Sequence, residues 1–390
     1  PGISEFASSP EQVSDYIAPL LSFAARHVPR SKHRETPLYI LCTAGMRILP
    51  QSQQKAILED LLTDIPVHFD FLFSDSHAEV ISGKQEGRWA LGKCLGNFGN
   101  SQGKIWDRKA LKSWVNLEVS KASQKFPLGS GPGSDPGFAV QEEVAKSLLA
   151  EVNLGCDAHQ TEHVYRVYVA TFLGFGGNAA RRRYEESLLS SRNSRALLIS
   201  RRQAGLSPQA PLPDPCLPRD APDELRLRGL RLHLRGTGDF QLCRERLRPL
   251  LNRTNGTGSS LNGVRQPPLQ LQSSEFYGFS EFYYCTEDVL RMAPGSFPFS
   301  RFSAFLQDYC ATRWSVLRER FERGLYAPHA DLHRLKFQCF KSAWMFEVFH
   351  RGFSFPESYG SLRTALQVYD KEVQWTLGAI LYRTRFLPLR

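Results

Sequence analysis

The chain has 390 residues, of which 42% are hydrophobic and 12% are aromatic. It is long enough for two lobes with a core in each, and too apolar to be a largely disordered chain. Its formal net charge of +10 would suit a polyanionic partner, but no RNA- or DNA-binding motif accompanies the arginine-dense stretch 181–235. We therefore expect no nucleic-acid partner and interpret these arginines as a solvated surface.

The sequence carries no signal for crossing or reaching a membrane. No run approaches the roughly 20 consecutive apolar residues that span a bilayer. The start, PGISEFASSP, lacks the basic residues and the apolar core of a targeting peptide. We expect a fragment of a longer protein, whose membrane anchors, if it has any, lie in terminal segments absent here.

The first 87 residues alternate between helix and strand signals. A helix is predicted over residues 10–27, because a serine and a proline stand at its start and apolar residues then recur on one face. Strand patterns cover residues 38–42 and 67–73, and a helix pattern covers residues 52–63 between them. This order predicts an α/β lobe.

The regular pattern fades over residues 88–140, where glycine, lysine, serine and proline intrude, and we interpret this stretch as a linker or an aberrant insertion. A helix is predicted over residues 141–153, and a strand over residues 164–173 leads through a glycine turn into another helix. Residues 208–268 are rich in proline and short turns. From Glu287 onward the chain is predicted to be mostly helical.

The segment Thr43-Ala-Gly-Met-Arg47 directly follows a strand that reads as buried. A hydroxyl, open backbone amides and a guanidinium can meet an anion at such a place. An ordinary strand-to-helix turn is the alternative.

Glu86 stands in Ile81-Ser-Gly-Lys-Gln-Glu86-Gly87, between small residues at the end of a predicted strand. A carboxylate in that position can polarise a water for attack on phosphorus. The alternative is an exposed loop glutamate without a catalytic role.

The aromatic run from Phe276 to Tyr284 could offer a face on which a nucleobase stacks. A run of this kind is also typical of a protein core, and both interpretations stay open at this point.

The eight cysteines form no CxxC pair, so a zinc site is not predicted. Two adjacent glycosylation sequons begin at Asn252 and Asn255, in a polar loop that could carry glycans. Together with widely spaced cysteines, these sequons favour a secretory lumen.

Several of these segments resemble the conserved regions of the ecto-nucleoside triphosphate diphosphohydrolase, or apyrase, family. They are LCTAGMRILP, VISGKQEG, FYGFSEFYY and the terminal VQWTLGAILYRTRFLPL. The resemblance covers about residues 10–87 and 141–390. The amino-acid sequence, including the segments FLGFGGNAA and CFKSAWMFEVFHRGF, is most similar to the intracellular Golgi and lysosomal branch. Members of that branch favour UDP and other nucleoside diphosphates or triphosphates.

The resemblance implies a two-lobed α/β fold of the actin, hexokinase and Hsp70 type, with an incomplete N-terminal lobe. It implies in-line attack of water on the terminal phosphorus with a divalent cation, Ca²⁺ or Mg²⁺. It places Glu86 as the general base and Thr43 at the phosphate and metal-water site. Tyr284 and Arg334 match the pair that sandwiches the base. The family's setting is the lumen of the Golgi and lysosomal system, associated with membranes.

The resemblance also implies disulfides. Cys310–Cys339 resembles a family pair, Cys216–Cys243 is a plausible second pair, Cys156–Cys285 is a guess, and Cys42 is expected to be a buried free thiol. The expected organisation is a partial N-terminal lobe (1–87), the divergent stretch (88–140), a C-terminal lobe (141–370), and a final helix (371–390) that packs back on the N-terminal lobe.

Two Gly/Ser-rich phosphate loops of the family are not visible: one should precede residue 1 and the other should lie near residues 110–140. Phosphoryl transfer depends on positioning and electrostatic stabilisation, so we expect impaired hydrolysis in this chain. The alternative is a catalytically inactive nucleotide-binding or regulatory relative. A sugar or metabolite kinase of the same superfamily is a third hypothesis, which the lack of a kinase-type phosphate loop disfavours.

Overall fold

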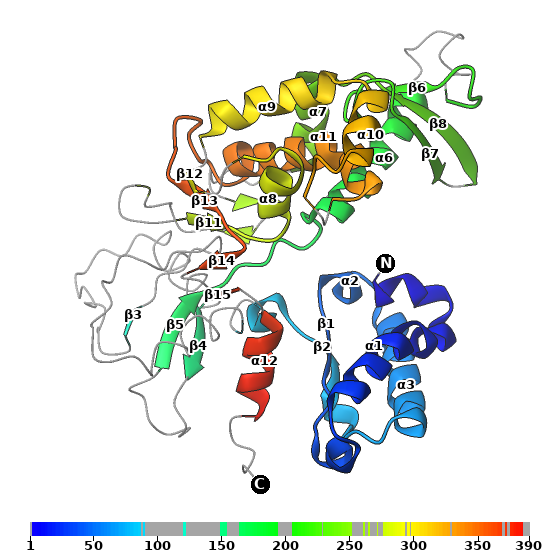
Figure 1. The fold of residues 1–390 in the computed structure, drawn as a ribbon, viewed down its shortest axis with the longest axis vertical. Coiled ribbons are helices and arrows are strands. Elements are labelled where there is room, and N and C mark those ends of the chain that lie inside the picture. The colour runs from blue at the N-terminus through cyan, green and yellow to red at the C-terminus, as the bar shows by residue number, and fades with distance from the viewer. Residues whose placement is uncertain are drawn as a thin grey trace, which may run out of the picture.

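The computed structural model describes residues 2–86, 89, 120–121, 149–153, 164–193, 205–227, 229–251, 260–261, 264–265, 271, 276–292, 295–296, 298–327, 330–368, 371–372 and 375–384. The expected linker 88–140 therefore lies almost wholly outside the described residues. The described elements form two groups (Figure 1), a smaller one from the start of the chain and a larger one from its second half.

The smaller lobe packs helices against a short parallel sheet. Helix α1 (Val13–His27) and helix α3 (Gln51–His68) meet through a buried apolar cluster. The carboxylate of Asp60 ties them together by accepting hydrogen bonds from the backbone amide and hydroxyl of Ser14, at 3.2 and 2.7 Å. Strands β1 (Ile40–Cys42) and β2 (Ala78–Val80) run parallel. The short helices of this lobe are η1 (Ile3–Ser8), η2 (Pro10–Gln12), η3 (Arg30–Glu35), α2 (Ala44–Arg47) and η4 (Asp75–His77).

The helices predicted over residues 10–27 and 52–63 are present, but the strand predicted over residues 67–73 is wrong. Helix α3 continues to His68, and the Phe69 amide still donates to the Ile65 carbonyl at 2.9 Å. Only Leu72 pairs beyond it, in an isolated bridge with Pro37. Of the alternating apolar residues, Val67 lies in the last turn of α3, and Phe69, Phe71 and Phe73 follow it. The partner of β1 is β2.

The last helix of the chain, α12 (Trp375–Thr384), contacts the smaller lobe. Ala379 is buried in one cluster with Ile81 and Trp89, and a Cβ at Gly378 would overlap the Trp89 carbonyl oxygen. Arg383 forms an ion pair with Glu79 of β2. Figure 1 shows α12 beside β1 and β2, next to the lobe formed by the start of the chain.

A three-stranded antiparallel sheet joins segments that are distant in sequence. Its order is β3 (Ser120–Lys121), β5 (Val164–Tyr168) and β4 (Leu149–Asn153). The strand predicted over residues 164–173 is present only over residues 164–168, and the helix predicted over residues 141–153 is wrong over residues 149–153. Five paired positions with β5, from Leu149↔Tyr168 to Asn153↔Val164, override the helical spacing of the apolar residues.

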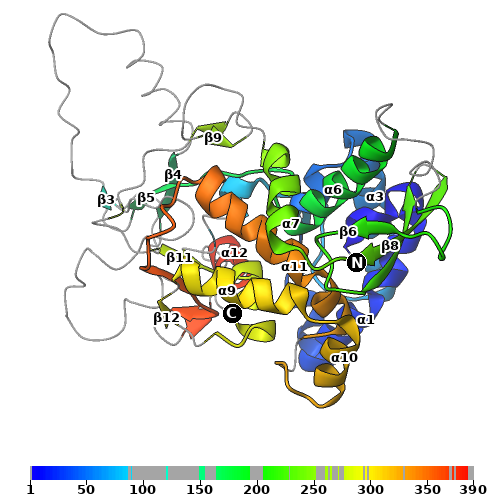
Figure 2. The same ribbon diagram turned by 90° about the horizontal axis from the view of Figure 1, so that it is seen from above.

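The larger lobe is a helical body with short sheets at its edges (Figures 1 and 2). One extensive buried cluster, rich in phenylalanine, holds its helices together. The helices are α6 (Gly177–Asn193), α7 (Phe240–Leu247), η6 (Arg248–Leu251), α8 (Glu281–Tyr284), η7 (Cys285–Val289), α9 (Phe299–Ala311), α10 (Trp314–Glu322), α11 (Leu332–Glu347) and η8 (Val348–Gly352).

Three small sheets complete this lobe, in the strand orders β6-β8-β7, β11-β13-β12 and β10-β9. A further pair, β14 and β15, precedes α12. The strands are β6 (Leu212–Asp214), β7 (Pro222–Leu227), β8 (Leu230–Gly236), β9 (Ser260–Leu261), β10 (Val264–Arg265), β11 (Phe276–Gly278), β12 (Gly295–Ser296), β13 (Leu362–Thr364), β14 (Gln367–Val368) and β15 (Lys371–Glu372).

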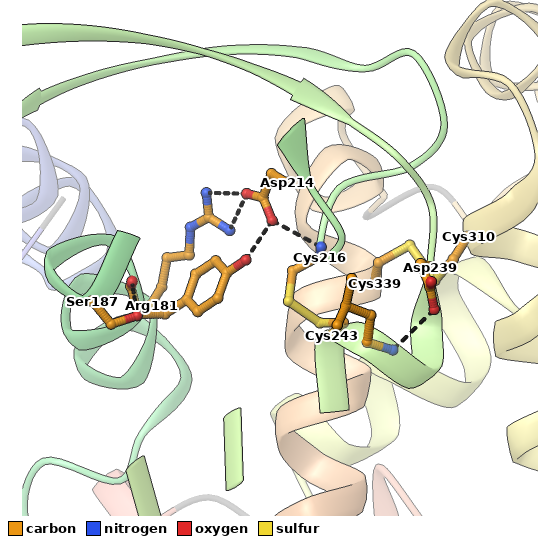
Figure 3. Close-up of a disulfide and its surroundings, with 10 residues drawn as sticks. Arg181, Ser187, Asp214, Cys216, Asp239, Cys243, Cys310 and Cys339 are labelled. Carbon is orange, nitrogen blue, oxygen red and sulfur yellow. Dashed lines mark hydrogen bonds and ion pairs between the residues drawn. A yellow bond between two sulfur atoms is a disulfide. The ribbon is translucent and has the colours of Figure 1, made fainter. Parts of the chain in front are cut away.

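Two buried disulfides fasten α7 and α11 to their surroundings (Figure 3). Cys216 is bonded to Cys243, with Cα atoms 4.9 Å apart, and Cys310 to Cys339, with Cα atoms 5.7 Å apart. The fully buried Asp214 accepts hydrogen bonds from the Cys216 amide at 2.8 Å and from the Tyr184 hydroxyl at 2.6 Å. These are the two pairs that the family resemblance implies.

Cys285 is a buried free thiol, so the guessed pair Cys156–Cys285 is wrong on the side that the structure describes. Its Sγ lies 3.6 Å from a carboxylate oxygen of Glu281. Cys156 lies outside the described residues, as does Cys94. Cys42 is a buried free thiol, as expected.

In the part of the chain that the structure describes, no helix combines the length and the apolar character needed to cross a membrane.

Candidate functional site

The Thr43–Arg47 segment forms a tight helical turn at the end of β1. The Thr43 carbonyl accepts hydrogen bonds from the amides of Met46 and Arg47, at 3.1 and 3.2 Å. Met46 is 1% exposed, so it anchors the turn in the core of the smaller lobe. Thr43 and Arg47 are left at the partly exposed rim, directly after the strand.

Arg47 contacts the candidate catalytic carboxylate. Its Nη2 lies 3.2 Å from Oε2 of Glu86, and its Nη1 donates to the Ile81 carbonyl at 2.7 Å. The Arg47 side chain is 15% exposed and that of Glu86 is 31% exposed. The guanidinium therefore holds one side of the carboxylate, while a water can still reach Glu86.

A capping box fixes the helical turn that carries Glu86. After β2, residues 83–86 are helical. The Ser82 amide donates to the Gln85 side-chain oxygen at 2.8 Å, and the Gln85 amide donates to the Ser82 hydroxyl at 3.2 Å. This reciprocal pair satisfies two free amides at a helix start. The sequence Ser82-Gly-Lys-Gln85 has the residue spacing of this motif.

Gly83 brings the same turn against the segment that enters the larger lobe. A Cβ at Gly83 would overlap the Thr171 side chain, so only glycine permits this approach. Thr171 precedes the turn at Gly174, whose φ of +88° suits glycine. The carbonyl of Gly174 accepts a hydrogen bond from Arg183 of α6 at 2.8 Å. The Glu86 turn is thus packed against the connection between the lobes.

The described residues do not assemble a protein-based metal site. Among them, no three His, Cys, Asp or Glu side chains lie close enough to hold an ion. The carboxylate of Glu86 already forms an ion pair with the Arg47 guanidinium. A divalent cation at this site would need oxygen ligands from elsewhere, of which nucleotide phosphates are the common source.

Tyr284 and Arg334 lie together in the larger lobe. The Cζ atom of Arg334 lies 4.9 Å from the centre of the Tyr284 ring. Asp331 places Arg334 in the first turn of α11 by accepting its amide hydrogen bond at 2.6 Å. Both side chains are partly exposed. The pair therefore has the cation–π contact that the resemblance implies.

Two carboxylates border this pair and were not singled out from the sequence. Nη1 of Arg334 lies 3.4 Å from Oε1 of Glu281, and its Nε lies 3.7 Å from Oδ2 of Asp288. The same oxygen of Glu281 lies 3.1 Å from Nζ of Lys341. The only signal in the sequence is helical spacing, since Glu281, Tyr284 and Asp288 stand three and four residues apart.

The structure thus forms two groups, Thr43–Arg47 with Glu86 in the smaller lobe and Tyr284 with Arg334 in the larger. Between these groups, the described side chains have no hydrogen bond or ion pair. The glycosylation candidates Asn252 and Asn255 lie outside the described residues.

Comparison with known families identifies what the chain is similar to. The GDA1/CD39 (nucleoside phosphatase) family matches residues 1–390. This range is wider than the two segments on which the sequence resemblance rested, and it includes residues 88–140.

Curated relatives match the full chain. Ectonucleoside triphosphate diphosphohydrolase 4 of Mus musculus is 66% identical over 411 residues, and ectonucleoside triphosphate diphosphohydrolase 7 of the same organism is 55% identical over 399. Both alignments cover 100% of this chain and 66% of the relative. Nucleoside-diphosphatase mig-23 of Caenorhabditis elegans is 32% identical, with 70% of its length covered. The chain thus spans about two thirds of these relatives.

A solved structure shares the fold. It is that of nucleoside triphosphate hydrolases from Neospora caninum, with a TM-score of 0.51 and 14% sequence identity, over 98% of this chain and 77% of that one. At this identity the likeness concerns the fold alone. The prediction of a two-lobed, actin-like α/β architecture is confirmed.

Proposed function

Because the chain belongs to the GDA1/CD39 (nucleoside phosphatase) family, we propose that it hydrolyses nucleoside diphosphates and triphosphates, UDP among them, to the monophosphate and phosphate. The observation that carries this proposal is the contact between Arg47 and Glu86, at 3.2 Å. It joins the Thr43–Arg47 turn and the Glu86 turn into one arrangement suited to activating water.

Glu86 is the proposed general base. A carboxylate that accepts the proton of the attacking water must be accessible, and its orientation must be fixed. The side chain is 31% exposed, Arg47 holds one of its oxygens, and the capping box fixes its backbone. Thr43 stands at the start of the same turn as Arg47, where its hydroxyl can form hydrogen bonds with the phosphate and its bound water.

Tyr284 and Arg334 are the proposed base-binding pair. An aromatic ring and a guanidinium both stack on nucleobases, and such stacking tolerates different bases. This tolerance suits a substrate class that includes UDP, GDP and other nucleoside diphosphates or triphosphates. The base is thus bound in the larger lobe, and the terminal phosphate is attacked in the smaller one.

The proposed substrate is the complex of the nucleotide with Ca²⁺ or Mg²⁺. Family members use divalent cations, and Mg²⁺ is commonly held through substrate phosphates and water. The proposed setting is the lumen of the Golgi or lysosomal system, with membrane attachment through segments outside this sequence.

The test is phosphate release from UDP, GDP and ATP by the purified chain, with calcium, with magnesium, and with EDTA. Glu86→Gln should lower the turnover number by about 10²- to 10⁴-fold, the range of general-base catalysis. Glu59→Gln is the matched control, because Glu59 is an exposed helical carboxylate paired with Lys55. Equal turnover of wild type and Glu86→Gln would reject the assignment of the base.

An inactive regulatory relative is the weaker alternative, because the relatives that match the whole chain are named as hydrolases. Of residues 110–140, where one missing phosphate loop is expected, the structure describes only Ser120–Lys121, so the expected impairment stays a prediction. Nucleotide binding without metal-dependent phosphate release would favour the regulatory alternative over hydrolysis.

A further inference from the structure

The Tyr284–Arg334 pair is closed. A base inserted between ring and guanidinium needs two van der Waals layers of roughly 3.5–4 Å each, so about 7 Å in total. The observed separation is 4.9 Å. Arg334 must therefore move by about 2 Å before a base can stack against Tyr284, and the groups that hold Arg334 control this movement.

Asp288 holds Arg334 from a rigid position. Its side chain is 4% exposed and lies in the π-helical turn η7 (Cys285–Val289). The side-chain amide of Gln338 donates to the Cys285 carbonyl at 2.7 Å and so ties this turn to α11. Asp288 and the backbone of Arg334 therefore belong to one packed unit, and Asp288 is a buried ion-pair partner of Nε at 3.7 Å.

Glu281 holds the other edge of Arg334 from a much freer position. Its side chain is 39% exposed, and it is the first residue of the one-turn helix α8. Its Oε1 contacts Nη1 of Arg334 and, at 3.1 Å, Nζ of Lys341. Glu281 can thus rotate toward solvent or remain with Lys341 while Arg334 moves away.

We propose that Asp288 and Glu281 are opposed positioning residues of the base site. Asp288 keeps the guanidinium in place for stacking, whereas Glu281 stabilises the closed pair and must release Nη1 when a base enters. This inference rests on the proposed function, in that Tyr284 and Arg334 bind the base. It goes further in one respect. Although both carboxylates lie on one helical segment, removing one should weaken nucleotide binding and removing the other should strengthen it.

The two substitutions should act in opposite directions. Glu281→Gln weakens the closed contact with Arg334, so the dissociation constant of a nucleotide should fall about two- to fivefold, as expected for a half-exposed ion pair. Asp288→Asn removes the buried anchor, so the dissociation constant should rise about tenfold.

The experiment measures dissociation constants by calorimetry on the full chain with calcium, using the α,β-imido analogue of UDP. Imidodiphosphate, which has the same phosphate chemistry but no base, is the companion probe. Its affinity should be unchanged by either substitution. Glu319→Gln is the matched control variant, because Glu319 pairs with Arg323 on the exposed face of α10. Thermal melting reports whether each variant is folded.

Tighter binding of the nucleotide analogue alone by Glu281→Gln supports the inference. Unchanged or weaker binding overturns it, as does an equal change with imidodiphosphate. If Asp288→Asn fails to fold, Glu281→Gln and Glu281→Ala decide the matter. Wild type that binds the analogue but releases no phosphate from UDP would refute hydrolysis and leave this inference standing. Wild type that does not bind the analogue would refute the base site and this inference together.

Discussion

Arg47 and Glu86 lie 39 residues apart in sequence and meet through one guanidinium–carboxylate contact. The second hydrogen bond of Arg47, to the Ile81 carbonyl, ties this contact to the segment that follows β2. Arg47 therefore fixes the position of the Glu86 carboxylate relative to Ile81 and to the turn that carries Arg47 itself. A residue of this kind affects the chemical step by positioning another group.

Arg47→Ala should lower the turnover number of the proposed hydrolysis by about 10- to 100-fold, because a carboxylate misplaced by about 1 Å loses its alignment with the attacking water. The Michaelis constant should change by less than about twofold, since Arg47 lies away from the base-binding pair. Steady-state kinetics with UDP separates the two constants. A large rise in the Michaelis constant alone would show that Arg47 binds substrate instead.

The buried thiol of Cys42 should be unreactive in the folded protein. Burial raises its pKa to about 11, and only the thiolate reacts readily. At pH 8, which is below this pKa, the thiol stays protonated, so iodoacetamide should label Cys42 only after unfolding in guanidinium. Mass spectrometry of the labelled peptides measures this. Rapid labelling of Cys42 in the native protein, as fast as that of added glutathione, would contradict the buried position.

At this scale the sequence could predict the types of residue but not their partners. Thr43, Glu86, Tyr284 and Arg334 could be singled out because their neighbours form recognisable motifs. The partner of Glu86 could not, because the contact with Arg47 spans 39 positions and depends on how β1 and β2 pair. The carboxylates beside Arg334 likewise become visible only when α8 and α11 pack together.

Helix α12 packs very closely against the residue Trp89. Gly378 faces the Trp89 carbonyl, and no side chain can be placed there without moving the backbone. The ring of Trp89 is buried beneath the same helix, 6.4 Å from the ring of Trp375. The fit is therefore a direct approach of helix to backbone, supported by stacked rings.

Gly378→Val should destabilise the protein by about 1–3 kcal/mol, the usual cost of overpacking. Urea unfolding gives the change in the free energy of unfolding, and limited proteolysis should cut near α12 earlier than in wild type. Gly360→Val is the control, because a Cβ at Gly360 meets no atom within 4 Å. Equal stability of the two variants would show that α12 does not need this close contact.

Elements with strong local signals could be predicted, and those decided by distant partners could not. The helix over residues 10–27 has a start pattern and a continuous apolar face, and it is present. Residues 149–153 have helical spacing, yet they pair with β5. The hairpin of β7 and β8 was missed inside a proline-rich stretch, although Gly229, with a φ of +77°, marks its turn.

On the scale of the whole molecule, the two disulfides that the described residues form cross-link the larger lobe around α11. Cys216–Cys243 closes a separation of 27 residues and Cys310–Cys339 one of 29. Cross-links of this length restrict the unfolded chain more than the folded one, which raises the free energy of unfolding. The larger lobe should therefore unfold as one cooperative unit.

Replacing Cys216 and Cys243 by alanine together should lower the free energy of unfolding by about 3–4 kcal/mol, as expected for a loop of this length. Guanidinium unfolding followed by tryptophan fluorescence measures it. Wild type with both bonds intact is the reference, and Cys42→Ala is a cysteine control outside the bonds. An unchanged midpoint would mean that Asp214 and its neighbours hold this region without the covalent link.

The architecture of the whole could be predicted only through resemblance. Periodicity alone indicates an α/β lobe followed by a helical region. It does not predict how these two parts pack against each other. The match to the family over residues 1–390 and the shared fold at a TM-score of 0.51 supply that arrangement. The packing of α12 on the smaller lobe joins residues about 290 positions apart, which no local pattern encodes.

This packing also determines the order of events on the ribosome. Among the described residues, Ala379 and its neighbours on α12 pack against the surface formed by Ile81 and Trp89, and they are made roughly 15–60 s later at ordinary rates of synthesis. During that interval the larger lobe can fold and form its disulfides. The apolar surface of the smaller lobe stays exposed over the same time. This apolar face of the smaller lobe therefore stays uncovered by α12 until that helix has been made.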